Sequence, residues 1–490
     1  MQAARPWIVR RQRGGFMKKS GVKRAKRWCA LFAAAVCAAA LVAGCGRRGG
    51  HRDEDGKILL EFWSIYPEGD ANYEWMMSVI DRFEKEHDDI RIHYTGISFW
   101  DYFTKITTAM TDPTGPDVYL QTIKDTADRA RGSVSMNLTP FFDESFHAGT
   151  EFFYEEDVLP MTYEGSVYGV PYALDNRVMY YNIDLVNALK DSTDEDWMKT
   201  KAAAKEGTTI TGKPQDLVGA DGNVRAPETY DELLAYQELL TVTENGKITQ
   251  LGFDVNVGNF KVENVVWTNG GEYFDSEGNP VVDTNPGVRR GFEVWYELTH
   301  TLSSARVNAF LDTAGDNTTN LFWSGKVAVM IATNEIPWQN DKLGAQKIRL
   351  GAAPVPYNRV EENHYNFTGG FSLEMAGRLA KEDEEVQQAA FEFIKYLCSE
   401  EIQVEVLTQS SNMPANIKSY DSLFASITDP EKVVVLEEMA HRKAFDYIYD
   451  APNWWGEIQN ALTDYTADKK SLDQTLQRAQ NAILQLKASY

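Results

Sequence analysis

Short apolar runs alternate with amphipathic stretches between residues 57 and 120, and this alternation limits the fold more than any other feature of the sequence. Three of the runs are rich in strand-forming residues and are bounded by polar or turn-forming residues: 57–63, 90–94 and 117–120. The stretch between the first two runs repeats apolar residues at helical spacing, and residues 99–110 are predicted to form a second helix. Strand, helix, strand, helix, strand is the pattern of a parallel sheet covered by helices, so we predict an α/β fold.

Later segments continue this layering. Residues 326–331 and 348–355 are predicted to be further strands, and residues 275–287 a turn-rich excursion that forms a small hairpin. The last helix is predicted to begin at a capping box, in which the side chains of Ser471 and Gln474 accept hydrogen bonds from each other's backbone N–H. About 440 residues of such alternation are enough for two large lobes.

A basic and then apolar leader begins the sequence. Basic residues in 18–27 precede the apolar stretch 28–43, which is short for a membrane-spanning helix and typical of a secretory signal. Two small residues then precede Cys45, and this segment resembles the bacterial lipobox, whose cysteine becomes a diacylated N-terminus. We therefore predict that translation starts at Met17, that residues 1–44 are removed, and that two acyl chains on Cys45 anchor the protein. An uncleaved signal anchor with an incidental cysteine is the alternative.

Removal of the leader makes the chain strongly acidic. The leader holds ten of the 49 basic residues and none of the 72 acidic ones, so the remainder carries 39 basic residues and a formal charge of −33. Such a surface repels nucleic acid and anionic lipid headgroups, which leaves the lipid anchor as the predicted membrane contact. Residues 45–56 are polar and glycine-rich, as expected of a flexible tether. Only Cys398 then remains as a thiol, so no intramolecular disulfide is expected.

Motifs for catalysis are missing from the sequence. It has no G-x-S-x-G nucleophile elbow and no glycine-rich phosphate-binding motif, so we expect no catalytic residues. Its seven histidines are scattered, so we expect no metal site and no cofactor. A carboxylate pair for glycoside hydrolysis can be chosen from 72 acidic residues in many ways, and this abundance makes any one choice uninformative.

Aromatic residues are abundant outside the predicted core faces. The sequence has 12 Trp, 23 Tyr and 23 Phe, and many lie next to Gly, Asn or Asp in predicted loops. Sugar rings present apolar faces that stack on aromatic rings, while carboxylates, amides and backbone groups bind the hydroxyls at the rim. Candidates for such stacking are Trp63, Tyr66, Trp100, Trp267, Trp338, Trp454 and Trp455. Core packing is an equal alternative for a single tryptophan, but the adjacent pair in "DAPNWWGE" is predicted to form an exposed shelf.

Seven stretches match one protein family in the family's own order. "YEGSVYGVPYALDNRVMYYNIDLV" (163–186) is similar to the family block "dGkiYGvPy…lyYNkdl", and "LFWSGKVAVMIATNEIPWQ" (321–339) to its "F..GkaAM…g.W" segment. The other matching stretches are "APETYDELL" (226–234), "VVWTNGGEYFDSEGN" (265–279), "IRLGAAPVPY" (348–357), "NFTGGFSLEMA" (366–376) and "AAFEFIKYLCSEEIQ" (389–403). Together they resemble the extracellular solute-binding proteins of ABC importers, in the carbohydrate-binding cluster that includes the maltose-binding protein.

This resemblance implies a two-lobed, periplasmic-binding-protein-like α/β fold that closes over a ligand in the cleft between its lobes. Three crossing segments are expected to form the hinge: 172–176, 367–371 and 413–416. Lobe 1 is expected to hold residues 57–172 and 371–413, and lobe 2 residues 173–368 and 414–490. Residues 191–226 are charged and glycine-rich and have no counterpart in shorter members, so a surface insertion is expected there.

The resemblance also implies where ligand binds. The positions expected to contact it are Trp63, Tyr66, Glu68, Gln121, Asp175, Trp267, Asn269, Gly270, Glu335, Trp338, Gly369, Gly370, Trp454 and Trp455. Asp175 takes the place of a sugar-binding carboxylate, and Trp338 that of a stacking tryptophan. Ile336 and Pro337 replace the usual glycine before Trp338, so Glu335 is an alternative contact there. The two glycines at 369 and 370 suit a hinge or a close backbone approach to ligand, with an ordinary turn as the alternative.

The implied function is that of a non-enzymatic substrate-binding subunit of an ABC importer, monomeric and lipid-anchored at Cys45 on the outer face of the bacterial cytoplasmic membrane. Its expected ligand is an oligosaccharide, delivered by hinge closure to a permease with a separate ATPase. A polyamine or a polyol phosphate is an alternative ligand, although Arg177 is the only basic residue predicted near the cleft. A cell-surface glycosidase or lyase is the alternative from another class.

Overall fold

The computed structural model of the chain describes residues 51–203, 214–315, 317–357, 363–446, 448, 450, 451 and 453–489. Asp53–Tyr490 form one compact unit, and the elements below belong to it. The predicted leader, Cys45 and the first residues of the predicted tether lie outside the described residues. Among the described helices, none has the length and apolar character needed to cross a membrane.

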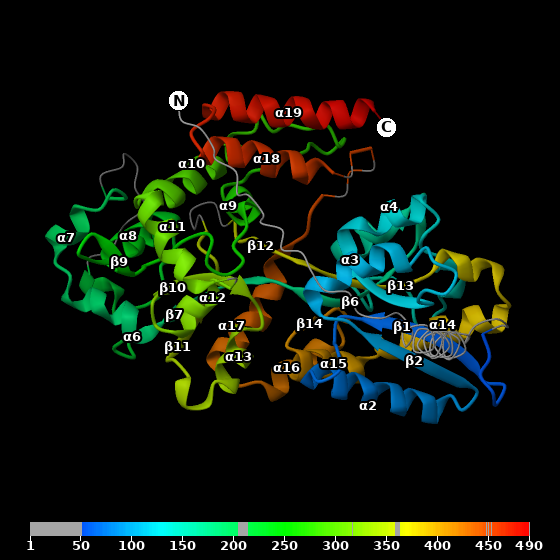
Figure 1. Cartoon of the computed structure of the whole chain (residues 1–490). Helices are drawn as coiled ribbons and strands as arrows, with labels where there is room; N and C mark the ends of the chain where they lie inside the picture. The colour runs from blue at the N-terminus through cyan, green and yellow to red at the C-terminus, as the bar shows by residue number, and fades with distance from the viewer. Residues whose placement is uncertain are drawn as a thin grey trace, which may run out of the picture. The chain divides into compact units, whose positions relative to one another are not determined.

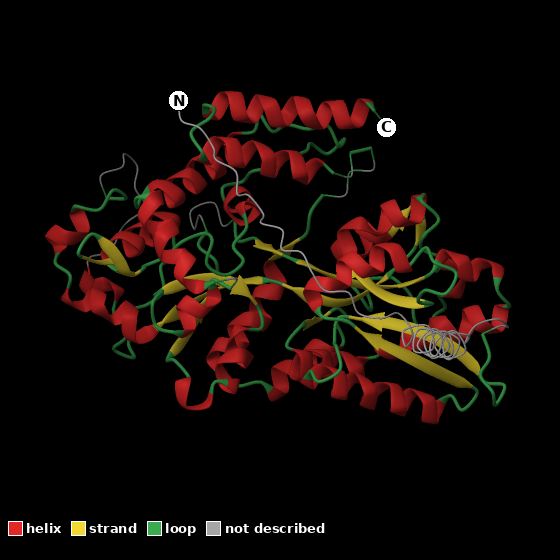
Figure 2. Cartoon of the chain, in the orientation of Figure 1, coloured by secondary structure: helices red, strands yellow, loops and turns green. Residues whose placement is uncertain are grey.

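The first lobe is built on a six-stranded sheet, which we call the large sheet (Figures 1 and 2). Its order is β14-β6-β13-β3-β1-β2, and its strands are β1 (Ile58–Ser64), β2 (Ile90–Gly96), β3 (Val118–Thr122), β6 (Val170–Asp175), β13 (Gly369–Met375) and β14 (Met413–Pro414). β1 pairs parallel with β2 and β3, which confirms the predicted parallel arrangement for these three strands. β13 pairs antiparallel with β3 and β6, and β14 antiparallel with β6, so the complete sheet is mixed.

Helices pack on this sheet through apolar faces. They are α2 (Ala71–Glu86), α3 (Phe99–Ala109), α4 (Thr126–Arg131), α5 (Glu155–Val158), α14 (Glu384–Leu397) and α15 (Glu400–Ser410), and α16 (Ser419–Ser426) packs on α15. The carboxylate of Asp70 caps α2 by accepting a hydrogen bond from the Asn72 N–H at 2.7 Å. α14 places the Phe393 ring 5.1 Å from the ring of Phe62 on β1. α2 and α3 are the two helices that the sequence predicts between residues 57 and 120.

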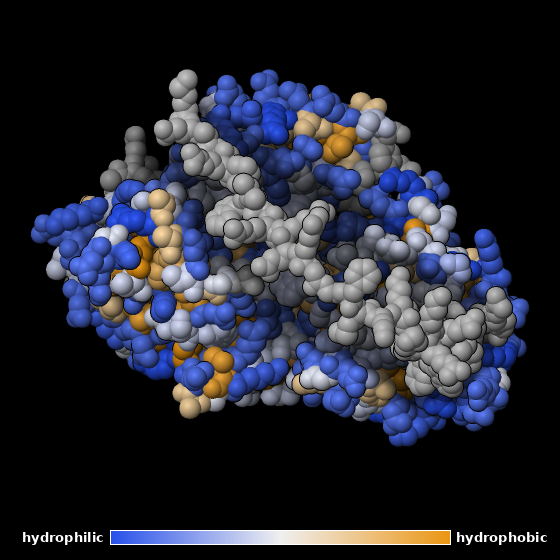
Figure 3. All heavy atoms as spheres, viewed as in Figure 1, coloured by the Kyte–Doolittle hydropathy of each residue, from blue (hydrophilic) through white to orange (hydrophobic). Residues whose placement is uncertain are grey.

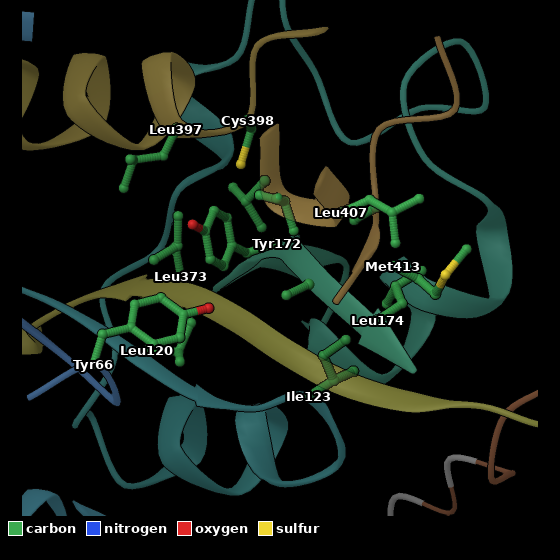
Figure 4. Close-up of a cluster of buried hydrophobic side chains, with 14 of the residues drawn as sticks. Tyr66, Leu120, Ile123, Tyr172, Leu174, Leu373, Leu397, Cys398, Leu407 and Met413 are labelled. Carbon is green, nitrogen blue, oxygen red and sulfur yellow. The ribbon is translucent and has the colours of Figure 1, made fainter. Parts of the chain in front are cut away.

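The core of the first lobe contains a cluster that joins β3, β6 and β13 to the helices α14 and α15 (Figure 4). Its labelled members are Tyr66, Leu120, Ile123, Tyr172, Leu174, Leu373, Leu397, Cys398, Leu407 and Met413. The Cys398 Sγ lies 3.7 Å from the carbonyl oxygen of Pro171, and burial raises the pKa of this thiol. The Tyr66 side chain belongs to the same cluster, and burial raises its pKa to about 12.

The second lobe is built on a three-stranded antiparallel sheet, the small sheet, in the order β10-β7-β11. Its strands are β7 (Arg177–Asn182), β10 (Val329–Thr333) and β11 (Leu350–Ala353). β10 and β11 are the two strands predicted at 326–331 and 348–355, with different limits. The helices of this lobe include α6 (Ile183–Val186), α7 (Asp194–Met198), α8 (Tyr230–Leu239), α9 (Val262–Thr268), α11 (Ser304–Leu311), α12 (Thr319–Trp323), α13 (Ile336–Lys342) and α17 (Pro430–Glu438).

The described parts of residues 191–226 contribute to the core of the second lobe. Trp197, Leu217 and Val224 are buried in it. Residues 204–213 lie outside the described residues. That the segment is an insertion relative to shorter members of the family that the sequence resembles stays a prediction.

Two C-terminal helices, α18 (Trp454–Thr466) and α19 (Leu472–Ala488), pack on each other and on α10 (Pro286–His300) (Figure 1). The predicted capping box is confirmed, because the backbone N–H groups of Ser471 and Gln474 each donate to the other's side chain. The predicted hairpin at 275–287 is reduced to one bridge between Phe274 and Pro280. The carboxylate of Asp275 accepts hydrogen bonds from two backbone N–H groups of this turn. These N–H groups are therefore not available to pair two strands.

Short paired strands complete the fold: β12 (Asn366–Phe367) with β15 (Arg442–Lys443), β4 (Thr162–Tyr163) with β5 (Ser166–Val167), and β8 (Val242–Glu244) with β9 (Lys247–Gln250). The face drawn in Figure 3 is mostly hydrophilic, with its apolar side chains in small separate groups. This distribution fits a chain with a formal charge of −23.

Hydrogen bonds join the chain segments that pass between the two sheets. β6 of the large sheet runs directly into β7 of the small sheet, and β12 runs into β13. The side chain of Asn366 accepts from the Arg177 N–H at 2.7 Å and donates to the Arg177 carbonyl oxygen. The Thr368 hydroxyl donates to the carbonyl oxygen of Asp175 at 2.6 Å. The limits given above for the two lobes stay a prediction.

Candidate functional site

A cavity of about 360 Å³ lies beside these tied segments, and we call it the cleft. Its lining comes from three parts of the chain: residues 122–125, 156, 157 and 160; residues 367–370; and residues 444–446, 448 and 453–456. The first group follows or supports strands of the large sheet, and the third leads into α18. A cavity of this volume, lined from several elements, has the dimensions of a small-ligand site.

An aromatic wall, formed by Phe445, Trp454 and Trp455, lies on one side of the cleft. The Phe445 ring centroid lies 5.6 Å from that of Trp454 and 5.4 Å from that of Trp455. Each indole N–H is held: Trp455 Nε1 donates to Glu263 Oε1 at 2.6 Å, and Trp454 Nε1 donates to the carbonyl oxygen of Asp446 at 3.1 Å. These hydrogen bonds fix the rings before any ligand binds.

The predicted exposed shelf at positions 454 and 455 is wrong for Trp454. Its side chain is only 3% exposed, because it packs against Tyr273 and Phe274 as well as Phe445. Trp455 is half-buried and lines the cleft. Trp455 is therefore the better placed of the two to stack on a ligand.

Charged groups line the cleft beside the aromatic wall. Four carboxylates belong to it, those of Asp125, Glu156, Asp157 and Asp446, and one ammonium, that of Lys124. The Lys124 Nζ lies 3.6 Å from Asp125 Oδ1. The prediction that Arg177 is the only basic group near the cleft is therefore wrong, since Lys124 lines it.

Asp157 is the most deeply buried of these carboxylates. It pairs with Arg442, whose Nε lies 3.4 Å from Asp157 Oδ2 and whose guanidinium carbon lies 3.2 Å from the centroid of the Tyr154 ring. Burial raises the pKa of Asp157 to about 6, although the Arg442 charge opposes this rise. The pair lies between α5 and β15, so it joins elements that follow the large sheet to the C-terminal part of the chain.

Asp175 lies at the junction of β6 and β7 and is held by two neighbours. Its Oδ1 accepts from the Gly369 N–H at 2.7 Å and lies 2.9 Å from Arg177 Nη1. Gly369 and Gly370 line the cleft, while Asp175 itself is not among the lining residues. A Cβ on Gly370 would lie 2.5 Å from the Ala173 carbonyl oxygen, so glycine is required there by a close approach of two strands.

Arg177 also holds this junction in place. Its Nε donates to the carbonyl oxygen of Asn259 at 2.8 Å, and its guanidinium carbon lies 4.9 Å from the centroid of the Phe367 ring. Because Arg177 is buried and fully engaged, it orients Asp175 and Phe367 and does not face the cleft.

Other residues expected to contact ligand are not among those that line the cleft: Trp63, Tyr66, Glu68, Gln121, Trp267, Asn269, Gly270, Glu335 and Trp338. Trp267 is only 1% exposed and stacks on Phe367 at 6.0 Å, so it supports a cleft residue from the core. The Gln121 side chain accepts from the Thr122 N–H at 2.8 Å and so fixes the first lining residue. The Asn269 side chain donates to the carbonyl oxygen of Val265 in α9, the helix that ends just before it.

Around Trp338, the structure shows protein partners for Glu335 and for the Trp338 ring. The Glu335 carboxylate accepts from the Thr333 hydroxyl at 2.6 Å, and burial raises its pKa. The Lys432 ammonium lies 5.6 Å from the centroid of the Trp338 ring. Glu68 and Gly270 are exposed, and Trp63 is half-buried in β1. The ligand roles of all these residues stay predictions.

Sequence reasoning missed all five charged residues that line the cleft. Lys124 and Asp125 come two and three residues after β3, and the carboxyl end of a strand is the usual place for a site in an α/β sheet. Extending the expected site past Gln121 would have found them. Asp446 and Glu156 carry no such signal, because Asp446 lies in an irregular segment and Glu156 in the short helix α5, and neither follows a strand of the large sheet.

Comparisons with known proteins agree with this architecture. Residues 78–433 match the family model described as bacterial extracellular solute-binding protein. The maltodextrin-binding protein MdxE of Bacillus subtilis (strain 168) is 23% identical over 473 residues, covering 94% of this chain and 97% of that protein.

Solved structures show the same fold. CpMnBP1 with mannotriose bound superposes with a TM-score of 0.66 at 20% identity, over 87% of this chain and 99% of that one. The maltose/maltodextrin-binding domain MalE from Bdellovibrio bacteriovorus, bound to maltotriose, gives a TM-score of 0.63 at 15% identity over the same shares. The fold is the two-lobed α/β fold with a cleft between the lobes. With the family model covering well over half of its length, the chain belongs to the bacterial extracellular solute-binding proteins.

Proposed function

We propose that this chain is the substrate-binding subunit of an ABC importer and that it captures an oligosaccharide in the cleft. The observation that carries this proposal is the aromatic wall beside carboxylates, with Trp455 half-buried and its indole N–H fixed by Glu263. A sugar ring needs an apolar surface for its face and acceptors for its hydroxyls, and the cleft offers both. The names of the maltodextrin- and mannotriose-binding relatives support the same ligand class.

Capture works by hinge closure. Lining residues come from the loop after β3 and from the segment before α18, which belong to different parts of the chain. A ligand that touches both groups stabilises the arrangement in which they are close and shifts the equilibrium towards it. The closed form is then the form that the permease recognises. No bond of the ligand is broken in this cycle, so the chain is a binding protein and not an enzyme.

The proposed location follows from the leader. Residues 1–44 direct export, and the thiol of Cys45 carries two acyl chains that hold the monomeric protein at the outer face of the bacterial cytoplasmic membrane. Mass spectrometry of the protein from its native membrane tests this: a diacylated N-terminal Cys45 is expected. An N-terminus upstream of Cys45, or an unmodified thiol, contradicts the anchor.

The ligand class is tested by thermal shift with malto- and manno-oligosaccharides, spermidine and sugar phosphates. A ligand that binds only the folded chain raises the melting temperature by mass action. We expect a shift with one oligosaccharide series that is lost in Trp455→Ala. Trp100→Ala is the matched control, because Trp100 is 87% exposed and does not line the cleft. No shift with any oligosaccharide contradicts the proposal.

A polyamine is the second candidate ligand, because four carboxylates and only one ammonium line the cleft. The same charge balance disfavours a polyol phosphate. Sustained hydrolysis of an oligosaccharide on prolonged incubation would instead favour a glycosidase, and it would overturn the proposal of a binding protein.

A further inference from the structure

The charged groups that line the cleft are mostly negative. Its lining carries four carboxylates against the single ammonium of Lys124. The Asp125 carboxylate lies near that ammonium and also accepts from the Thr122 hydroxyl at 2.8 Å. Asp157 has Arg442 beside it. Glu156 and Asp446 are the two lining carboxylates that form no ion pair among the described residues.

Asp446 is the more informative of these two. It is half-buried beside the aromatic wall, and burial raises the pKa of its carboxyl group. Within the described part of the chain, no hydrogen bond or ion pair holds this carboxylate. The positive charge of Lys443 opposes this rise in pKa, but the Lys443 ammonium is bonded to another carboxylate: its Nζ donates to Glu272 Oε1 at 2.5 Å and lies 5.2 Å from the centroid of the Trp267 ring.

A ligand that covers such a carboxylate must compensate its charge. Neutral sugar hydroxyls donate hydrogen bonds but leave the negative charge in a drier environment, which is unfavourable. An ammonium group supplies up to three donors together with the opposite charge, and charge-assisted hydrogen bonds are about twice as strong as neutral ones. The aromatic wall adds to this, because the faces of Trp and Phe attract cations.

The protein itself supplies an example of this chemistry. The Lys124 ammonium lies 3.6 Å from Asp125 Oδ1 and 5.8 Å from the centroid of the Trp455 ring. An ammonium group is thus already placed between a carboxylate and the aromatic wall within the cleft. Asp446, beside the same wall, has a carboxylate and aromatic neighbours of the same kind, and within the described residues no ammonium forms an ion pair with it.

We infer that the cleft takes an oligosaccharide that carries a free amino group, whose ammonium pairs with Asp446 against the aromatic wall. This inference rests on the proposed function and names the ligand class within it. The rest of the sugar stacks on Trp455, and its hydroxyls bind Asp125 and the backbone of residues 368–370. Glu156, exposed at the edge of the cleft, contributes to attraction of the cation.

Isothermal titration calorimetry on the purified full chain tests the inference with two matched series. One series is the β-1,4 trimer of glucosamine, its N-acetylated form and cellotriose, and the other is maltotriose and its 6-amino-6-deoxy derivative. In a series that binds, we expect the amine to bind about tenfold tighter than its neutral partner at low salt. The advantage is expected to shrink as salt rises.

Variants locate the effect. Asp446→Asn is expected to remove the preference for the amine while it leaves affinity for the neutral partner almost unchanged. Asp421→Asn is the matched control, because Asp421 is exposed on α16 and does not line the cleft. Circular dichroism and melting curves verify that both variants are folded.

The outcomes separate the inference from the proposed function. If neutral and N-acetylated sugars bind as tightly as the amines, or if Asp446→Asn keeps the preference, the inference is overturned and the proposed function stands. If neither sugar series binds while spermidine does, both are overturned.

Discussion

Trp455 shows how one side chain serves the fold and the cleft together. Its indole N–H donates to a buried carboxylate on α9, that of Glu263, and burial raises the pKa of this group. The ring is therefore held at the cleft by a hydrogen bond from behind, with Phe445 beside it. A ring that is fixed in advance loses little conformational entropy when a ligand stacks on it.

Two substitutions separate these roles. Trp455→Phe keeps an aromatic face and removes the donor, so we expect affinity within a few-fold of the wild type and a loss of about 1–3 kcal/mol in unfolding free energy. Trp455→Ala removes the face as well, and we expect it to cost at least about 2 kcal/mol of binding free energy. Calorimetric titration and urea unfolding measure the two effects. Equal loss of affinity in both variants would contradict the stacking role.

Asp157 makes a pH-dependent contribution with a definite sign. Its pKa in the folded chain is about 6, above the ordinary value of 3.8, so the folded state holds this proton more tightly than the unfolded state does. Its contribution to stability is therefore present at low pH and is lost as the pH rises through about 6. The shift corresponds to about 3 kcal/mol.

Asp157→Asn removes this titration. As the pH rises from about 4 to about 7.5, the wild type acquires a costly buried charge at this position and the variant keeps a neutral amide. We therefore expect the difference in unfolding free energy between the two proteins to change in favour of the variant over this range. Arg442 keeps the Met439 carbonyl oxygen, at 2.9 Å from Nη1, and the Tyr154 ring as partners. Urea unfolding at both pH values measures the difference. A pH-independent difference would show that Asp157 does not titrate in this range.

At the scale of elements, a buried ion pair holds the loop that forms one end of the cleft. Arg129 on α4 donates to Glu374 on β13 from Nε at 2.9 Å and from Nη2 at 2.5 Å. Glu374 also accepts from the Thr126 and Ser372 hydroxyls, both at 2.9 Å. Arg129 Nη2 donates in addition to the carbonyl oxygen of Thr122, the first lining residue. These bonds hold the pKa of Glu374 below its usual range, although burial alone would raise it.

Replacement of either partner leaves the other buried charge uncompensated. We expect Arg129→Met to lower the free energy of unfolding by about 3–5 kcal/mol. Arg131→Met, two residues away on α4, is the control: its partner Asp128 is partly exposed, and such pairs contribute about 0–1 kcal/mol. Urea unfolding of both variants measures the contrast. Similar losses in the two variants would contradict a special role for the buried pair.

The sequence predicts best those elements that are determined by residues close together in the chain. β1, β2, β3 and the helices between them follow from apolar spacing within short windows, and the capping box at Ser471 depends on two residues. β13 and β14 pair with strands that lie far away in the sequence, so local pattern does not specify their neighbours. The same holds for the cleft, where Asp446 arrives from an irregular segment. Trp267 resembles a loop aromatic in the sequence, yet tertiary packing places it in the core.

At the scale of the whole molecule, the segments between the sheets set how its two lobes are joined. The pairing of β6 with β13 ends at Asp175 and Gly369. The chain enters the second lobe directly after Asp175 and has left it just before Gly369. Hydrogen bonds from Asn366 and Thr368 tie these segments together. Closure must therefore bend the chain close to residues that line the cleft, which links ligand binding to the angle between the lobes.

Gly370→Ala tests this region. The new Cβ would meet the Ala173 carbonyl oxygen at 2.5 Å, at a φ of +154°, so we expect a loss of about 3 kcal/mol in stability and weaker ligand binding. Gly369→Ala is the control, because its nearest contact, Asp175 Oδ1, lies at 3.3 Å and its φ is not positive. Melting curves and titrations of both variants measure the effect. Equal tolerance of both would show that the strands can separate at Gly370.

The strand order of the large sheet also has a consequence for biosynthesis. β3 ends at Thr122, but its neighbour β13 begins only at Gly369, and the edge strand β14 follows at Met413. A chain that leaves the ribosome N-terminus first therefore exposes an unfinished sheet for most of its synthesis, and such distant pairings form slowly. For a member of an extracellular family, this delay is useful, since a chain that has not yet folded can still be threaded through a translocation channel.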